Sequence, residues 1–346
     1  MRLDRLLTLY LFGPLSRLRR LPPGSVRIPI LMYHSISDTP ETGHPYYWIN
    51  TKPALFAEHM RFLYENDCQV IPLTTAVELI RTGNSEPQVL NSKSEILNEE
   101  QPTNQPNKPR YVVLTFDDGY LDFYTEAFPI LRQYGYPATI FLPTDYIDGS
   151  KPGLREKKHL AWEQVRELSQ SGIDFGSHTC SHPQLYDLKP NEIELELRKS
   201  KETIEQILNS NQPLTQSPSN PINQLPTSPI NQSTRFPLTV ASFCYPYKFP
   251  EGDGPFVKSI EGMLRGSGYT SCATTRIGTG NNKEDLYSLK RIPVNSADDE
   301  MFFLSKLTGE YNWVYPFQVL RKNLLTPKKQ VASEPKFLIN NPPITH

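Results

Sequence analysis

The sequence predicts an α/β fold in which parallel strands alternate with helices. Two observations support this prediction. Strand-like apolar runs alternate with helix-like runs along most of the chain, which is the pattern of parallel strands joined by crossover helices. Four segments, 1–25, 84–109, 209–235 and 327–346, lack this pattern, and removing them leaves 248 of the 346 residues. A (β/α) barrel typically needs about 250 residues.

Seven runs are predicted strands and six are predicted helices. The strands are 28–33, 111–116, 138–142, 173–176, 242–245, 270–274 and 288–294. The helices are 53–66, 73–82, 120–134, 161–171, 189–209 and 256–266. Gly135 and Gly172 directly follow two of these helices, where glycine commonly ends a helix.

Two internal segments have the composition of disordered insertions. Segment 84–109 is polar and contains four prolines, and segment 209–235 is rich in Asn, Gln, Ser and Pro, with no charged residue from 209 to 233. Such segments bury too little apolar surface to offset the entropy lost on ordering. We therefore expect one domain over 26–326, interrupted by both insertions, and a flexible tail over 327–346.

Charge and cysteine content exclude two classes of protein. The formal net charge is −1 and 37% of residues are hydrophobic, so the chain can form a large core and has no basic excess for binding nucleic acid. The four cysteines, Cys68, Cys180, Cys244 and Cys272, have no pairing pattern typical of a disulfide-stabilised fold.

The first 25 residues predict an amphipathic N-terminal helix. The apolar stretch 6–15 is too short to span a bilayer, and no small-residue cleavage site follows it. Leucine and tyrosine side chains recur at helical spacing beside Arg2 and Arg5, which suits a helix lying on anionic lipid through residues 1–20. A helix packed on the barrel is the alternative.

Two short motifs predict a metal site with an adjacent base. Residues 115–120 (TFDDGY) follow the apolar run 111–114, and residues 178–182 (HTCSH) hold two of the seven histidines of the chain. One carboxylate and two imidazoles make a three-ligand site for Zn²⁺ or a similar ion, with a position left open for water. The other carboxylate is then free to act as a base.

These motifs resemble the polysaccharide deacetylase family, carbohydrate esterase family 4, which shares the NodB-homology domain. TFDDG at 115–119 and HTCSH at 178–182 match its first two motifs, and FCYPY at 243–247 partly matches its aromatic-Pro-aromatic motif. The segments ILMYHS at 30–35, WEQV at 162–165 and GSH at 176–178 resemble the branch that acts on poly-N-acetylglucosamine. The resemblance covers about 26–325.

The resemblance implies a distorted (β/α)7 barrel with the site at the carboxyl ends of the strands. It implies removal of acetyl groups from N-acetylglucosamine units of a polymer, with one divalent ion, Zn²⁺ or alternatively Co²⁺ or Ni²⁺, as cofactor. The implied metal ligands are Asp118, His178 and His182, the base is Asp117, and the backbone N–H of Tyr247 contacts the oxyanion. The expected substrate-binding residues are Tyr245, Pro246, Trp162 and Arg291. Cys180, between the two histidines, is not a ligand in this family.

Two departures from the family pattern concern proton transfer. Cys244 stands where many members carry an arginine that orients the base, and Arg291 stands where many carry a histidine that protonates the leaving amine. Arginine is a poor general acid because its pKa lies above about 12. We therefore predict that Arg291 contacts the oxyanion or a sugar hydroxyl, and that His34 is the proton donor. A structural role for His34 is the alternative. His44, His59 and His159 are expected to be exposed.

Two other functions fit the same residues. One is hydrolysis of another non-peptide C–N bond on the same scaffold, and the other is a non-catalytic, metal-containing polysaccharide-binding protein. An intact Asp117 argues against the second, because a binding protein needs no base. The resemblance favours the cell envelope as the location.

Overall fold

The computed structural model describes residues 2–17, 27–83, 109–149, 151–210, 237–281 and 284–325. Residues 84–108 and 211–235 of the predicted insertions, and the whole predicted tail 327–346, lie outside these ranges. Within the described residues, no helix combines the length and the hydrophobicity needed to cross a membrane.

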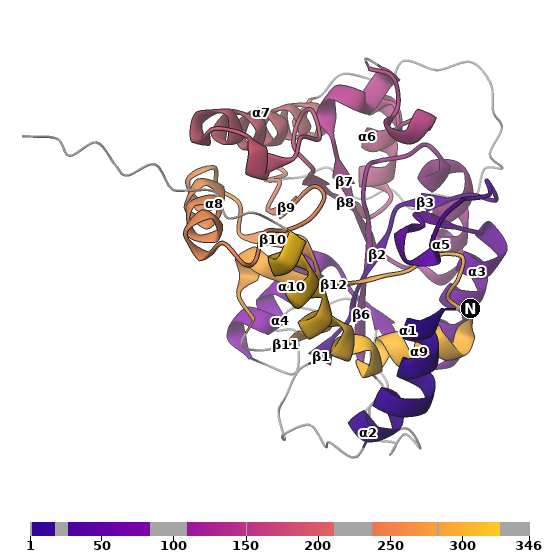
Figure 1. Cartoon of the computed structure of the whole chain (residues 1–346). Helices are drawn as coiled ribbons and strands as arrows, with labels where there is room; N and C mark the ends of the chain where they lie inside the picture. Colours follow the sequence, from indigo (N-terminus) through magenta and orange to yellow (C-terminus); the bar gives the residue numbers. More distant parts are fainter. Residues whose placement is uncertain are drawn as a thin grey trace, which may run out of the picture.

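Seven parallel strands close into a barrel (Figure 1). Their order around the ring is β2-β12-β10-β9-β8-β7-β6, and β6 pairs with β2 to close it. They are β2 (Ile30–Tyr33), β6 (Tyr111–Phe116), β7 (Ala138–Leu142), β8 (Ile173–Ser177), β9 (Ser242–Cys244), β10 (Ser271–Ile277) and β12 (Leu289–Pro293). These strands correspond to the seven predicted ones, and the prediction of a (β/α)7 barrel is confirmed.

The barrel is distorted where its strands are short or shifted. One register pair, Ser177 with Phe243, joins β8 to β9, and the β10–β12 register shifts between Ala273 and Ile277. Pro29 interrupts the first predicted strand, because proline cannot donate a ladder hydrogen bond. The short strands outside the ring are β1 (Arg27–Ile28) with β11 (Gly280–Asn281), β3 (Ser35–Ile36) with β4 (Asn50–Thr51), and β5 (Gln69–Val70) on β6.

Helices surround the barrel, and the main hydrophobic core lies between them and the strands (Figure 1). They are α3 (Pro53–Glu65), α4 (Leu73–Thr82), α5 (Phe128–Tyr134), α6 (Trp162–Gln170), α7 (Pro190–Asn209), α8 (Gly254–Gly266), α9 (Glu300–Leu307) and α10 (Val314–Leu325). The predicted helix 120–134 is a π-helical turn (Phe123–Ala127) followed by α5. Pro129 in its middle has no N–H for an α-helical bond, which accounts for the change. The sequence analysis missed α9 and α10.

The N-terminal segment is helical and docks beside α9. It consists of α1 (Leu3–Leu7), a π-helical turn (Thr8–Phe12) and α2 (Gly13–Arg17). Arg2 Nη1 lies 3.0 Å from Asp298 Oδ1, and the Phe12 ring stacks on Trp313 at 4.3 Å between centroids. Of the two roles considered for this helix, packing on the barrel is therefore present in the structure.

Candidate active site and metal centre

Asp117 and Asp118 lie at the carboxyl end of β6, and the turn after them sends their side chains in different directions. Asp118 has φ +70° and Gly119 has φ +61°. A Cβ on Gly119 would lie 2.8 Å from Leu142 Cδ2, so the turn requires glycine. Asp117 pairs with Arg291, whereas Asp118 faces His178. Two adjacent carboxylates thus occupy two different environments.

The side chains of Asp118, His178 and His182 converge on one point. Asp118 Oδ1 lies 3.5 Å from His178 Nε2 and 3.4 Å from His182 Nε2, and the two Nε2 atoms are 3.2 Å apart. Zinc bonds to N and O ligands are about 2.0–2.2 Å long, so tetrahedral ligand atoms lie roughly 3.3–3.6 Å apart. The three donor atoms therefore have about the spacing that one tetrahedral ion needs, and their chemistry suits Zn²⁺, Co²⁺ or Ni²⁺.

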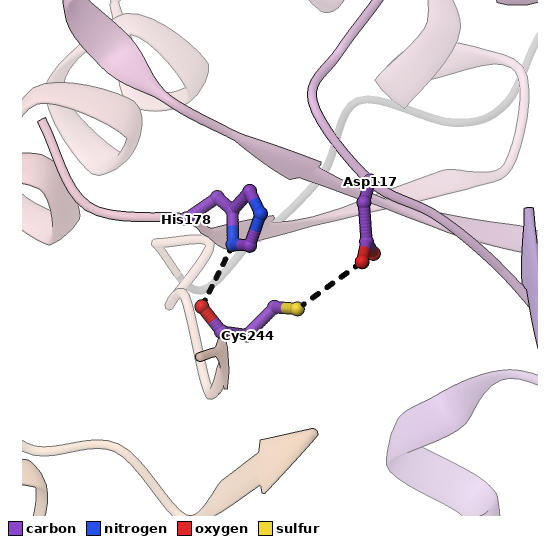
Figure 2. Close-up of side chains that lie close together, drawn as sticks. All are labelled: Asp117, His178 and Cys244. Carbon is purple, nitrogen blue, oxygen red and sulfur yellow. Dashed lines mark hydrogen bonds between the residues drawn. The ribbon is translucent and has the colours of Figure 1, made fainter. Parts of the chain in front are cut away.

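Hydrogen bonding and burial act differently on the three groups. His178 Nδ1 donates to the Cys244 carbonyl oxygen at 2.8 Å (Figure 2), which leaves Nε2 to face the cluster. Burial lowers the pKa of the His178 imidazole, but Cys244, Asp118 and Asp117 outweigh burial and raise that pKa, so a bound metal would displace a proton from Nε2. Burial, helped by His178, lowers the pKa of His182 to about 4. Burial opposes ionisation of Asp118, but His178, His34 and His182 outweigh it and lower the pKa of its carboxyl. An ionised Asp118 and a neutral His182 at neutral pH are what metal binding requires.

The loop 178–182 is strained and is held by one glutamate. Thr179 and His182 have φ values of +71° and +53°, and such strain in non-glycine residues is typical of functional sites. Glu196 of α7 accepts hydrogen bonds from the backbone N–H groups of Cys180 and Ser181 and from the Ser181 hydroxyl. The Cys180 thiol donates to the Glu196 carbonyl oxygen at 3.7 Å. Cys180 therefore faces α7, and the sequence analysis had missed Glu196.

Arg291 on β12 holds Asp117, and this corrects its predicted role. Its Nη1 and Nη2 donate to Asp117 Oδ1 and Oδ2 at 2.7 and 2.8 Å. Its other contacts are with the Thr274 carbonyl oxygen, Thr115 Oγ1 and Cys244 Sγ. The guanidinium is fully buried and fully engaged, so it cannot contact a sugar or an oxyanion. Arg291 instead supplies the charged contact to the base that Cys244 cannot make.

The charge of Arg291 also sets the state of Asp117. Burial alone would raise the pKa of the Asp117 carboxyl, but attraction and hydrogen bonds from Arg291 exceed that effect and lower the pKa. Asp117 is therefore an ionised acceptor at neutral pH.

Asp117, His178 and Cys244 form a second cluster of metal-ligating residue types (Figure 2). The Cys244 thiol donates to Asp117 Oδ2 at 3.5 Å, and Arg291 Nη2 lies 3.1 Å from its sulfur. Burial raises the pKa of this thiol despite the nearby arginine. A protonated thiol beside a guanidinium is a poor cation ligand, so Asp118 and the two histidines are the better candidate for holding a metal.

His34 lies beside Asp117 and lines a cleft. Its Nε2 is 3.9 Å from Asp117 Oδ2, and 23% of its side chain is exposed. Burial is the main influence on this imidazole and lowers its pKa. The prediction that His34 is at the site agrees with this position.

An aromatic cleft of about 430 Å³ opens next to His34. Tyr46, Tyr47 and Trp48 line it from the segment that precedes β4, and Tyr247 lines it from the segment that follows β9. The remaining lining residues are Met32, Ile49, Lys248, Thr275, Ile277, Pro293, Val294 and Gln318. The sequence analysis missed Tyr46–Trp48, although a run of three aromatic residues outside any predicted strand or helix was the available signal.

Of the aromatic residues that the sequence analysis placed at the site, Tyr247 lines this cleft, and Tyr245 and Trp162 do not. The Tyr247 ring is half exposed, 4.6 Å from the His182 ring, and its φ of +56° turns it outward. Tyr245 is fully buried against Phe249, and Pro246 is also buried. Trp162 begins α6 and packs against the core. The predicted substrate contacts of Tyr245 and Pro246 are corrected accordingly, because both side chains are buried, and Trp162 packs against the core and does not line this cleft.

Comparison with protein families supports the resemblance seen in the motifs. The family model described as "Polysaccharide deacetylase" matches residues 104–231, a range that includes both the TFDDG and HTCSH motifs. "Putative polysaccharide deacetylase YxkH" of Bacillus subtilis is 31% identical over 192 residues, which cover 56% of each chain. "Poly-beta-1,6-N-acetyl-D-glucosamine N-deacetylase" of Escherichia coli is 38% identical over 84 residues. That match covers 22% of this chain and 12% of the relative, so the chain spans only part of each.

Solved structures share the fold. The deacetylase PplD of Streptococcus pyogenes, in complex with acetate, aligns with a TM-score of 0.55 and 22% identity, over 82% of this chain and 98% of its own. IcaB of Ammonifex degensii aligns with a TM-score of 0.54 and 17% identity, over 83% and 97% of the two chains. The sequence match shows a polysaccharide deacetylase domain over residues 104–231, and the solved structures show that the fold they share extends over most of the chain.

Proposed function

We propose that the protein is a metal-dependent hydrolase that removes acetyl groups from N-acetylglucosamine units of a polysaccharide. The observation that carries the proposal is that two adjacent carboxylates, Asp117 and Asp118, have different partners. Asp118 is spaced with two imidazoles for one ion, while Asp117 is ionised, held by Arg291 and 3.9 Å from His34 at the cleft. Such a pairing of a metal site with a separate base is the arrangement for hydrolysing an amide.

The residues of the chain have separate tasks in this reaction. A divalent ion held by Asp118, His178 and His182, Zn²⁺ or alternatively Co²⁺ or Ni²⁺, supplies Lewis acidity when bound. Asp117 takes a proton from the attacking water. The backbone N–H of Tyr247 donates to the oxygen that becomes negative in the transition state. His34 gives a proton to the departing amine. Arg291 keeps Asp117 ionised and in place.

The cleft supports a sugar polymer as substrate. Tyr46, Tyr47, Trp48 and Tyr247 offer aromatic faces against which the apolar faces of sugar rings can pack. The names of the curated relatives point to the same class, because two of those that match, from Escherichia coli and Staphylococcus epidermidis, are poly-N-acetylglucosamine N-deacetylases. We assign this function to a catalytic domain over 26–326 and the protein to the cell envelope, where such polymers lie.

The alternative functions are disfavoured by the same geometry. A polysaccharide-binding protein that retained only its metal would have no use for a buried arginine that holds the adjacent carboxylate ionised. Hydrolysis of another non-peptide C–N bond uses the same groups, and an open aromatic cleft beside the site favours the polymer over a small cyclic substrate.

The test is to incubate the metal-loaded protein with N-acetylglucosamine oligomers and with a chromogenic acetyl ester, and to measure free amine and released chromophore. We expect both to be cleaved. Elemental analysis of the wild type and of His178→Ala accompanies the assay, and we expect one divalent ion per chain in the wild type only. Ester cleavage without any free amine would contradict the polymer assignment, and equal metal content would contradict the site.

A further inference from the structure

One face of the N-terminal helix exposes large apolar side chains. Leu3, Tyr10, Leu11 and Leu15 are between 48% and 70% exposed. Their spacing of seven, one and four residues places them on the same side of a helix. Four large apolar residues gathered on one helix face are more than the scattered exposed residues normal for a protein surface.

The face continues onto α10 through a line of aromatic rings. Phe12 stacks on Trp313, and Trp313 meets Phe317 edge-on with 5.6 Å between centroids. Phe317 and Leu320 of α10 are each 58% exposed. We call Leu3, Tyr10, Leu11, Leu15, Phe317 and Leu320 together the apolar face.

Polar contacts beneath the helix fix it to the barrel. Arg2 bonds to Asp298, whose carboxylate is fully buried, and the Tyr311 hydroxyl donates to Asp4 Oδ2 at 2.9 Å. Trp313 Nε1 donates to Thr8 Oγ1 at 2.9 Å. The apolar face is therefore presented in a fixed shape, and a partner need not supply the free energy of ordering it.

The two segments that carry the apolar face are basic. Residues 1–37 contain six arginines and one acidic residue, Asp4, and residues 311–333 contain four lysines or arginines and no acidic residue. The whole chain has a net charge of −1, so the remainder carries about −10. Arg2 is paired with Asp4 and Asp298, and Arg5 is paired with Asp299. Positive charge is thus concentrated in the segments that expose apolar side chains.

We propose that the apolar face docks the protein on an anionic lipid surface. Apolar side chains flanked by arginine and lysine are the composition of helices that lie in the interface of a bilayer. Gln318, between Phe317 and Leu320 on α10, lines the catalytic cleft and holds β10 through the N–H of Ile277. Docking through α1, α2 and α10 therefore holds the cleft close to the lipid. This proposal is independent of the proposed catalytic activity.

The test is co-sedimentation of the full chain with phosphatidylcholine vesicles, with and without phosphatidylglycerol, at low and high salt. We expect binding to the anionic vesicles, weakened by salt. The double variant Leu11→Glu, Leu15→Glu should lose binding by about 100-fold, because burying one leucine side chain is worth roughly 1.5–3 kcal/mol. Leu195→Glu on α7 is the matched control, since Leu195 is 52% exposed outside the apolar face, and it should bind as the wild type does.

Three results would overturn the proposal. One is equal binding by the double variant and the control, and another is equal binding to neutral and anionic vesicles. The third is a dimer in size-exclusion chromatography that the double variant abolishes without any vesicle binding by the wild type, which would assign the face to a second copy. Circular dichroism checks folding. If the double variant does not fold, Phe317→Ser, Leu320→Ser on the other helix takes its place, with the same expected loss.

Discussion

Arg291 donates hydrogen bonds to both carboxylate oxygens of Asp117, although the two residues belong to strands that are not neighbours in the barrel. Arg291 lies on β12 and Asp117 follows β6, and β2 stands between these strands in the closed ring. Both side chains are almost fully buried, and the two hydrogen bonds are 2.7 and 2.8 Å long. Closure of the barrel therefore brings Arg291 to Asp117, where it makes the charged contact that Cys244 cannot make. The stability of the barrel and the ionisation of the base depend on the same pair.

Removing Arg291 should raise the pKa of Asp117. Burial raises that pKa and Arg291 lowers it more than His34 or His178 does, so Arg291→Met removes the largest effect that opposes burial. The acid limb of kcat/KM against pH should then move to higher pH. The unfolding free energy should fall by about 3–5 kcal/mol, because an unpaired buried charge remains. Arg291→Lys keeps the charge without the two-point contact and should give an intermediate acid limb. An unchanged acid limb in both variants would contradict the role assigned to Arg291.

Changing Asp117 and Asp118 separately to asparagine should have different effects on deacetylation rate and on metal content. Asp117→Asn should retain metal and lose about 10²–10⁴-fold in deacetylation rate, the usual contribution of a general base. Asp118→Asn should lose metal affinity first, because an amide oxygen is a weaker ligand than a carboxylate. Elemental analysis and the amine-release assay on both variants give the comparison. Loss of metal in Asp117→Asn with retention in Asp118→Asn would reverse the two assignments.

The strands of the barrel, and the motif residues that follow them, could be predicted from the sequence. Continuous apolar runs such as 111–116 and 138–142 are buried on both faces in a parallel sheet, so their bounds agree with β6 and β7. The helix 73–82 is α4 with the predicted bounds, because Pro72 precedes it and Gly83 ends it in a left-handed conformation. The motif residues Asp118, His178 and His182 come together because each follows such a strand.

Contacts that depend on barrel closure could not be predicted. The partner of Arg291 is 174 positions away in the sequence, and nothing local indicates that its guanidinium turns inward. The aromatic wall of the cleft comes from one turn of 3₁₀ helix, Pro45–Tyr47, and the following Trp48, a segment too short for periodicity to be informative. Tyr245 and Trp162 were predicted to face substrate because an aromatic residue near a motif looks the same in sequence whether it faces substrate or core. The helices α9 and α10 were missed, and α9 is largely buried, with little polar pattern to mark it.

Removing the second predicted insertion should leave the fold intact. Asn209 at the end of α7 exchanges two hydrogen bonds with Leu238, of 2.7 and 2.9 Å, so the described ends of this segment already lie together. Helix α7 includes Asn209, which moves the start of the insertion from 209 to 211 at the earliest. Deleting 211–236 with a short Gly-Ser linker should change the melting temperature little.

The same deletion combined with Asn209→Ala is the informative control. This substitution removes the two hydrogen bonds to Leu238 that hold the ends of the segment together. Deletion of 84–108 tests the first insertion in the same way. A large loss of soluble protein or of melting temperature in both simple deletions would mean that these segments belong to the core.

His34→Ala should impair amide cleavage more than ester cleavage. His34 Nε2 is 3.9 Å from Asp117 Oδ2 and partly exposed to the cleft, so the proton that Asp117 takes from water can pass to His34 and from it to the departing amine. An amine leaves poorly without a proton, whereas an activated phenolate leaves without one. The measurement is the ratio of the two rates in the wild type and the variant. Equal losses on both substrates would mean that His34 positions substrate or structure, and no loss on either would leave Asp117 as both base and acid.

His59 should make the protein less stable below neutral pH. The sequence analysis expected it to be exposed, but it is buried on α3 and stacks on Phe303 with 4.0 Å between centroids. Its Nε2–H donates to the Asp298 carbonyl oxygen at 3.0 Å, and its Nδ1 accepts from the Tyr33 hydroxyl at 3.2 Å. The bond from Tyr33 requires the neutral ring, because Nδ1 has no lone pair once protonated, whereas Nε2–H can donate in either form.

Burial lowers the pKa of His59 from 6.5 to about 4. Between these two values the unfolded chain binds a proton that the folded protein does not, so stability rises with pH across this window. His59 therefore contributes stability that is complete above about pH 6.5 and is lost as pH falls toward 4, on the order of 3 kcal/mol in all.

Urea unfolding at a series of pH values measures this dependence. His59→Gln, which cannot titrate, should flatten it, whereas His44→Gln on the surface should leave it as in the wild type. Equal pH dependence in the two variants would show that His59 is not the titrating group.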